Sequence, residues 1–226
     1  MSPTSEATAQ APSVATVADG CLLLSHRLTE WVGNAPTMEE DVAVGNIALD
    51  LLGQARGLLG MLGDEDQLAY FRDADTFDNP ALCAAPNGDF ARTMLRQLFA
   101  DSWLGQVWAG WTTHDDDVVR GVAEKAVKEN AYHRRHSRAW VVRLGDGTEE
   151  SHLRMLTALD ELWPLTTEIA MPGWRESVAD ALVEATLPVP SPAALDAEAL
   201  ASCAEARREL LAEMQSLART HPGATW

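Results

Sequence analysis

Apolar residues recur every three or four positions along most of the chain, and turn-forming residues interrupt these stretches. A repeat of this kind predicts amphipathic α-helices rather than strands. Gly33-Asn34 marks one helix end, and Thr37-Met38-Glu39-Glu40 has the spacing of a capping box at the next helix start. The predicted helices span about 14–31, 37–63, 65–72, 89–113, 117–144, 148–164, 172–186 and 193–220.

Several of these helices are long enough to form a bundle. Four of them reach about 20 residues or more and are joined by short turns, which favours an antiparallel four-helix bundle with additional C-terminal helices. Pro164 is expected to bend or break the helix that contains it, and residues 187–192 (LPVPSP) form a connector. Residues 1–14 have neither a basic start nor an apolar core, so we expect a disordered tail before a single domain at 15–226.

Composition excludes some classes of function. The 226 residues carry a net charge of −17, which repels polyanions and argues against nucleic-acid binding. No apolar run approaches the length of about 20 residues that a membrane span needs. Three widely separated cysteines, without metal-ligand spacing, are typical of buried thiols in a reducing compartment. We therefore expect a cytoplasmic protein.

Polar residues interrupt the apolar stripes of the long helices. Asp50 lies on the stripe of the second long helix, Asp101 on that of the third, and Glu129 with His133 on that of the fourth. Glu30 shares a face of the first helix with apolar residues, but that helix also has a polar face, so for Glu30 alone we favour a solvated edge residue or a paired core residue. A buried carboxylate without a partner costs several kcal/mol, so these groups need partners. The candidate basic partners are His26, Arg27, Arg56 and His133.

One carboxylate on each of four long helices is the skeleton of a ferritin-like di-iron site, which takes a Glu from each of two helices and Glu-x-x-His from each of the other two. Glu30 and Asp101 could fill the single-acid positions, and Asp50 and Glu129 the paired ones. The histidines are missing at the required spacing, because the chain has Gly53 and Tyr132 there. For Glu129 and His133 we favour an internal hydrogen-bonded pair over metal ligation.

Long segments of the chain resemble a known family. They are LSHRLTEWVGNAP, NIALDLLGQAR, PNGDFARTMLRQLFADSW, KAVKENAYHRRHSRAWVVRLGDGT and LAEMQSLARTHPGATW. These segments are similar to the C subunits of phenylacetyl-CoA epoxidases, the ring 1,2-phenylacetyl-CoA monooxygenases of aerobic phenylacetate breakdown. The resemblance covers roughly residues 17–164 and 205–226, whereas the stretch 168–174 is shorter than in the family and the N-terminal tail is longer.

The resemblance implies a ferritin-like bundle in a multicomponent oxygenase. In that family a related A subunit holds the di-iron centre and binds the CoA thioester, and a small B subunit and a reductase complete the system. The C subunit lacks a working iron site and pairs with the A subunit as a structural partner. We therefore expect no cofactor in this chain, and a homodimer when the chain is alone.

Three hypotheses follow. The first is a non-catalytic scaffold that docks on the catalytic subunit, with Glu30, Asp50, Asp101, Glu129 and His133 as vestiges of a di-iron site. The second is a catalytically competent di-iron oxygenase or ferroxidase, which would need ligands at positions 53 and 132. The third is a free-standing helical adaptor, which explains the bundle but not the four acids.

Overall fold

A computed structural model describes residues 11–194 and 196–224, and in this part of the chain it contains helices and no strand. The all-α prediction is therefore confirmed. The α-helices are α1 (Val14–Thr29), α2 (Met38–Leu62), α3 (Ala81–Ala84), α4 (Phe90–Trp111), α5 (Asp117–Gly145), α6 (Glu149–Leu162), α7 (Trp174–Glu184) and α8 (Ala197–Thr220). Shorter turns are the π-helical Gln67–Phe71 and the 3₁₀-helical Ala74–Thr76 and Trp163–Glu168.

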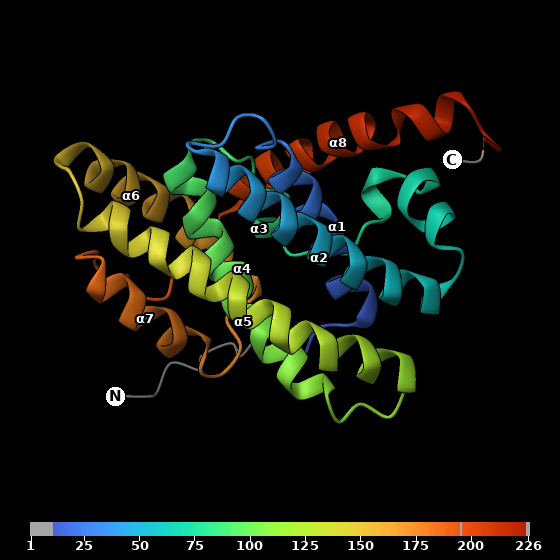
Figure 1. Cartoon of the computed structure of the whole chain (residues 1–226), viewed down its shortest axis with the longest axis horizontal. Helices are drawn as coiled ribbons and strands as arrows, with labels where there is room; N and C mark the ends of the chain where they lie inside the picture. The colour runs from blue at the N-terminus through green and yellow to red at the C-terminus, as the bar shows by residue number, and fades with distance from the viewer. Residues whose placement is uncertain (1–10, 195, 225–226) are drawn as a thin grey trace.

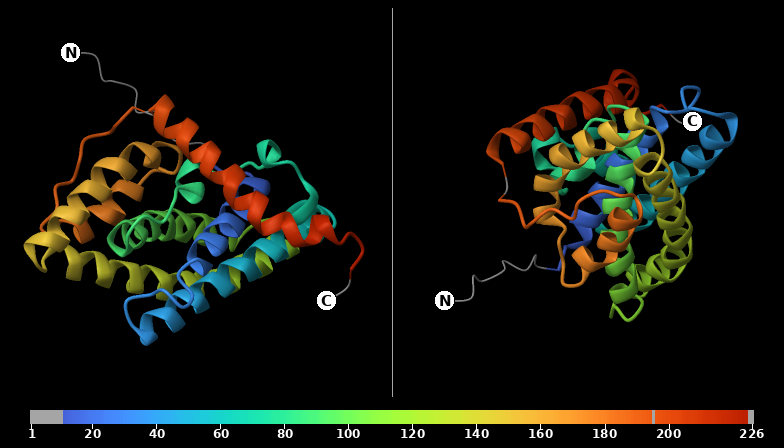
Figure 2. Two further views of the ribbon diagram at one scale, coloured as in Figure 1. Left: turned by 90° about the horizontal axis from the view of Figure 1, so that it is seen from above. Right: turned by 90° about the vertical axis from the view of Figure 1, so that its left-hand side faces the viewer.

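The four long helices α1, α2, α4 and α5 form the bundle (Figure 1). Contacts along α2 and α5 run in opposite directions, from Gln54 with Glu129 to Glu40 with His136, so these two helices are antiparallel. Ser137 Oγ on α5 donates a hydrogen bond to Asp101 Oδ2 on α4, which joins these two helices. Figure 2 shows that α2 and α5 lie along one edge of the molecule, with α1 and α4 behind them.

Gly20 of α1 packs against α3 and α4. A Cβ at Gly20 would lie in ordinary contact with the Trp103 ring (3.5 Å) and somewhat close to Cys83 Sγ (3.3 Å). Trp103 and Trp108 are buried in the same core. Burial of such large rings contributes much of the apolar area that stabilises the bundle.

The remaining helices cover the ends and sides of the bundle. Arg27 on α1 donates to the carbonyl oxygens of Ala84 on α3 and Ala206 on α8, and so joins three helices (3.0 and 2.9 Å from Nη2). In Figure 1, α6 and α7 lie together at one end of the molecule and α8 crosses over α1. None of the described helices is long and apolar enough to cross a membrane.

Several details differ from the sequence-based expectations. Residues 1–10 of the expected tail lie outside the described residues, but Ser13 caps α1 and Val14 begins it. The short helix α3 was not predicted. The helix expected to break at Pro164 does so, since α6 ends at Leu162 and a 3₁₀ turn follows. Thr37 caps α2 as expected, but the predicted capping box is wrong because the Glu40 side chain reaches α5 instead.

Candidate functional site

A cluster of polar side chains lies where α2, α4 and α5 meet. Asp101, on α4, is fully buried and accepts hydrogen bonds from Gln97 Nε2 (2.7 Å) and Ser137 Oγ (2.8 Å). Burial raises the pKa of the Asp101 carboxyl to about 6, although the nearby His133 and the two hydrogen bonds act in the opposite direction. Asp101 is thus a carboxyl group with two hydrogen-bond donors beside it and little solvation.

Asp50 and His133 form the second part of the cluster. His133 is fully buried, and its Nε2 lies 3.0 Å from Asp50 Oδ2. The Asp50 side chain is 37% exposed, so the expectation that it would be largely buried is wrong. Asp50 sits at the edge of the α2–α5 contact, where its carboxylate keeps part of its hydration while it holds the ring.

Glu129 is partly buried and has two partners. Its Oε2 accepts from Gln54 Nε2 at 3.0 Å, and its Oε1 lies 3.0 Å from Lys125 Nζ. The Glu129 carboxylate is therefore ion-paired with a neighbouring cation and hydrogen-bonded by an amide. Lys125 was not among the candidate basic partners. The favoured hydrogen-bonded pair of Glu129 with His133 is wrong, because the His133 ring contacts Asp50 instead.

Glu30 does not belong to this cluster. It lies at the C-terminal end of α1, where its carboxylate accepts from Arg27 Nη1 and Asn87 Nδ2, both at 2.8 Å. The side chain is 39% exposed. Glu30 is therefore a paired edge residue that fastens the end of α1 to the loop before α4, as favoured for this acid alone, and it does not fill the single-acid position of a di-iron site.

The interior residues of α2 and α5 lie one position away from those expected. Gly53 is exposed and Tyr132 points outward, so neither position faces the bundle centre. The pairs that do face it, at the i, i+3 spacing of Glu-x-x-His, are Leu51 with Gln54 and Asn130 with His133. One residue rotates a helix by about 100°, which is enough to move a side chain from the centre to the edge.

Asn130 is one of the residues that sequence reasoning missed. It is buried against Gly105 of α4. A Cβ at Gly105 would lie 2.7 Å from Asn130 Oδ1, so the absence of a side chain there leaves room for the amide. Gln97 and Ser137 were also missed. The signal for Ser137 and Asn130 was available, because both lie within one or two turns of His133 on the same face of α5.

The cluster does not provide the ligands of a two-metal centre. Gln54 and Asn130 are neutral amides, Glu30 is remote, and Asp101 and His133 are the only His or carboxylate side chains among the fully buried members. Within the described residues no group of three or more His, Cys, Asp or Glu side chains is placed to hold a metal ion. Three buried atoms of the cluster have no partner among the described side chains: Gln97 Oε1, Asn130 Nδ2 and His133 Nδ1.

A second polar contact links α2 to α5 nearer the start of α2. Oε2 of Glu40 accepts from Trp140 Nε1 at 2.8 Å and lies 2.7 Å from His136 Nε2. Tyr132 stacks on the His136 ring from outside. These contacts, together with Asp50–His133 and Gln54–Glu129, join α2 to α5 through polar side chains at three levels.

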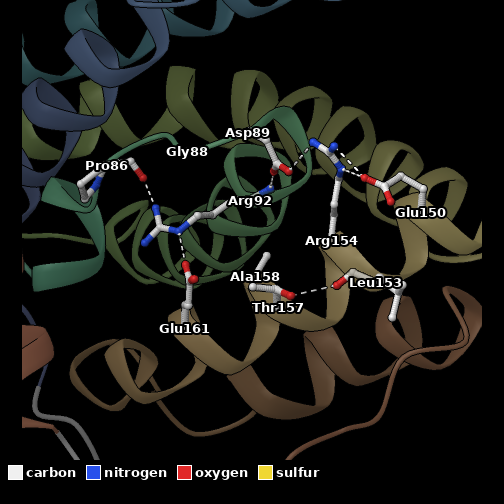
Figure 3. Close-up of a pocket in the computed structure, with 10 residues that line it drawn as sticks. All are labelled: Pro86, Gly88, Asp89, Arg92, Glu150, Leu153, Arg154, Thr157, Ala158 and Glu161. Carbon is white, nitrogen blue, oxygen red and sulfur yellow. Dashed lines mark hydrogen bonds and ion pairs between the residues drawn. The ribbon is translucent and has the colours of Figure 1, made fainter.

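A surface pocket of about 490 Å³ lies apart from this cluster, between the start of α4 and α6 (Figure 3). Two arginines line it, and both are paired with carboxylates: Arg92 with Glu161 (2.8 Å), and Arg154 with Asp89 (3.2 Å) as well as with Glu150. The pocket is thus lined by ion pairs that already satisfy one another, and it has the character of a structural contact between helices.

Comparison with known proteins identifies the family. Residues 1–173 match the family model described as phenylacetic acid catabolic protein. The chain belongs to this family. It is also 39% identical to the C subunit of the 1,2-phenylacetyl-CoA epoxidase of Escherichia coli (strain K12), over 236 aligned residues that cover 92% of this chain and 95% of that protein. The resemblance found in the sequence is therefore confirmed for this member of the phenylacetic acid catabolic family.

Proposed function

We propose that this phenylacetic acid catabolic family member is a non-catalytic structural subunit of a phenylacetyl-CoA epoxidase in aerobic phenylacetate catabolism. The observation that carries the proposal is the 39% identity to the C subunit of the Escherichia coli epoxidase over nearly the whole of both chains. An alignment of this extent supports a shared role in a multi-subunit enzyme.

The bundle centre supports the non-catalytic part of the proposal. At the two places where a ferritin-like di-iron protein has Glu-x-x-His, this chain has Leu51 with Gln54 and Asn130 with His133. Three of those four positions therefore carry neither a carboxylate nor an imidazole. Asp101 and His133 stand as remnants of a ligand set whose other members have become apolar or amide side chains.

The role we propose is to dock on the catalytic A subunit, which would hold the di-iron cofactor, and to support its active conformation. The B subunit and the reductase would act within the wider complex. The polar contacts between α2 and α5 suit this role, because they fix the relative position of two helices without chemistry of their own. A rigid bundle can present a fixed surface to a partner.

The test is reconstitution from separately purified subunits, with the chain expressed in iron-rich medium. We expect this chain alone to hold far less than two irons and to form no epoxide, and the catalytic subunit to gain stability or activity when this chain is added. About two irons per chain, with oxygen consumed on reduction, would instead support the alternative of a catalytically competent di-iron oxygenase or ferroxidase.

A further inference from the structure

Side chains of α8 donate hydrogen bonds to the backbone of the segment 67–79, which follows α2. The donors are Gln215 and Arg219, and the acceptors are the carbonyl oxygens of Ala69, Tyr70 and Arg72, at 2.7 to 3.1 Å. These carbonyl groups belong to the π-helical turn and to the residue after it, where the chain offers no further helical turn to supply donors. A helix far along the chain therefore completes the hydrogen bonding of this turn.

The first half of α8 also reaches the segment. Arg207 Nη1 donates to the carbonyl oxygen of Phe77 (3.3 Å) and to Asn79 Oδ1 (3.1 Å). Arg208 pairs with Asp75, with 2.9 Å from Nη2 to Oδ1. The α8 side chains are thus the donors along the length of the segment, and its short turns depend on α8 for their conformation.

The other side of the segment rests on α1 through a single buried carboxylate. Asp19 is fully buried, and its Oδ2 accepts from Arg72 Nη1 at 3.1 Å and from the Asp78 amide at 2.8 Å. Thr16 Oγ1 donates to Asp78 Oδ2 at 2.6 Å. A buried carboxylate that loses its cation is costly unless water replaces the cation. The segment can therefore leave α1 only in a motion that opens Asp19 to water.

The chain on both sides of these two parts is held by the bundle. The Ala81 amide, at the start of α3, donates to Glu168 Oε2 at 2.6 Å. In the connector before α8, the carbonyl oxygen of Ser191 accepts from Trp163 Nε1 at 2.9 Å. Residues 67–79 and α8 are thus bounded by fixed points, and we call these two parts together the strap.

The strap buries little apolar surface of its own. On α8 the large aliphatic side chains that are buried are Leu210 and Leu211, whereas α4 buries Trp103, Trp108 and Phe99 among many others. Figure 2 shows α8 crossing the outside of the molecule. Elements with few buried apolar contacts open at a lower free energy than the core, so α8 should open before the bundle unfolds.

We propose that the strap opens as one cooperative unit while the bundle of α1, α2, α4 and α5 stays folded, and that its opening uncovers Asp19 on α1. α8 supplies donors to the segment, and the segment supplies Arg72 to Asp19. Release of α8 removes the donors that hold the segment, and the segment then releases Asp19 to water. The inference concerns the fold itself and does not rest on the proposed function.

The test is native-state hydrogen exchange of the full chain in low concentrations of urea, followed by mass spectrometry. Amides of residues 68–72 and 206–215 should share one dependence on urea and exchange at least about a hundredfold faster than amides of α4. Equal protection of the strap and α4 would mean that the strap opens only when the whole chain unfolds, and would overturn the inference.

Asp19→Asn tests the coupling between the two parts, because Asp19 bonds to the segment and not to α8. Relative to α4, exchange should rise about tenfold in residues 206–215 as well as in residues 68–72. Arg138→Ala, which removes the ion pair with Glu184 between α5 and α7, is the control and should change neither region. Faster exchange in the segment with α8 unchanged would show that the two parts open separately.

The reciprocal variant acts from α8 and carries the test if Asp19→Asn does not fold. Gln215→Ala with Arg219→Ala removes the donors to the turn, so exchange of residues 68–72 should rise about tenfold relative to α4. Glu213→Ala, at an exposed position of α8, is the matched control and should leave the segment unchanged. Unchanged exchange of residues 68–72 in the double variant would show that the segment does not depend on α8.

Discussion

Nε2 of His133 on α5 lies 3.0 Å from Oδ2 of Asp50 on α2, and one of these partners is fully buried while the other is 37% exposed. The contact therefore spans the bundle from its centre to its edge. It joins α2 to α5. Loss of the contact should affect both the stability of the bundle and the relative position of these two helices.

We predict that His133→Ala lowers the free energy of unfolding by about 2 to 4 kcal/mol, because it removes a buried ring and leaves a cavity. Tyr132→Ala, one residue earlier but exposed, should change it by less than about 1 kcal/mol. Urea denaturation followed by circular dichroism measures both. Equal losses in the two variants would contradict the assignment of His133 as the interior residue.

Asp50→Asn should cost less than His133→Ala, about 1 kcal/mol or less, since the amide oxygen can still accept from Nε2 and the site is partly hydrated. The same urea titration measures the free energy of unfolding of both variants. A loss as large as that of His133→Ala would show that the negative charge itself, and not a hydrogen bond, holds the ring.

Asp101 should make stability depend on pH. Burial raises its folded-state pKa from 3.8 to about 6, so the folded protein binds more protons than the unfolded chain between about pH 4 and pH 6. Its contribution to stability is therefore most favourable below this window and is lost as pH rises through it, by up to about 3 kcal/mol.

The variant Asp101→Asn isolates this effect, because its side chain does not titrate. Relative to wild type, the variant should gain stability between pH 4 and pH 7, whatever its absolute stability. Chemical denaturation at several pH values measures the difference. A wild-type-minus-variant difference that stays constant across this range would mean that Asp101 has an ordinary pKa.

Two glycines should respond in opposite ways to alanine. A Cβ at Gly145, at the end of α5, would lie 2.3 Å from the carbonyl oxygen of Ala185, whereas one at Gly53 would meet nothing within 4 Å. Gly145→Ala should destabilise the fold by about 2 kcal/mol or more, and Gly53→Ala should stabilise it by about 0.5 to 1 kcal/mol. Thermal unfolding of both variants tests the close packing at the end of α5 and the open space beside Gly53 on α2.

Restoring the lost ligand types tests whether the centre is a vestigial metal site. The triple variant Leu51→Glu, Gln54→His, Asn130→Glu would place two Glu-x-x-His pairs beside Asp101 and the existing His133. We predict that it binds cobalt(II) with a d–d absorption spectrum, at one or more ions per chain, and that wild type does not. Failure of a folded triple variant to bind cobalt would argue against a vestigial site.

The helical fold could be predicted from the sequence to a large extent. Periodicity placed the long helices within a few residues of their observed ends, and Thr37, Gly33 and Pro164 marked boundaries that the structure contains. These signals are local, so they do not depend on which helices later pack together. The four-residue helix α3 gave no such periodicity and was missed.

The candidate site was harder to predict because α2 is apolar on more than one side. With Leu49 exposed and Leu51 buried, hydrophobicity alone could not decide which stripe faced the centre. Asp50 was therefore assigned to the interior when it lies at the edge. On α5 the buried Asn130 was overlooked in favour of the more conspicuous Glu129, although it lies one turn before His133 on the same face.

Leu49 on α2 and Tyr132 on α5 leave apolar surface exposed on the folded bundle. Under the proposed function, a chain that carries these side chains in water until the catalytic subunit binds can associate wrongly or be degraded while it waits. Surplus copies would then be short-lived, and their abundance would follow the supply of the catalytic subunit. Selection would accordingly favour synthesis of the two proposed subunits in matched amounts.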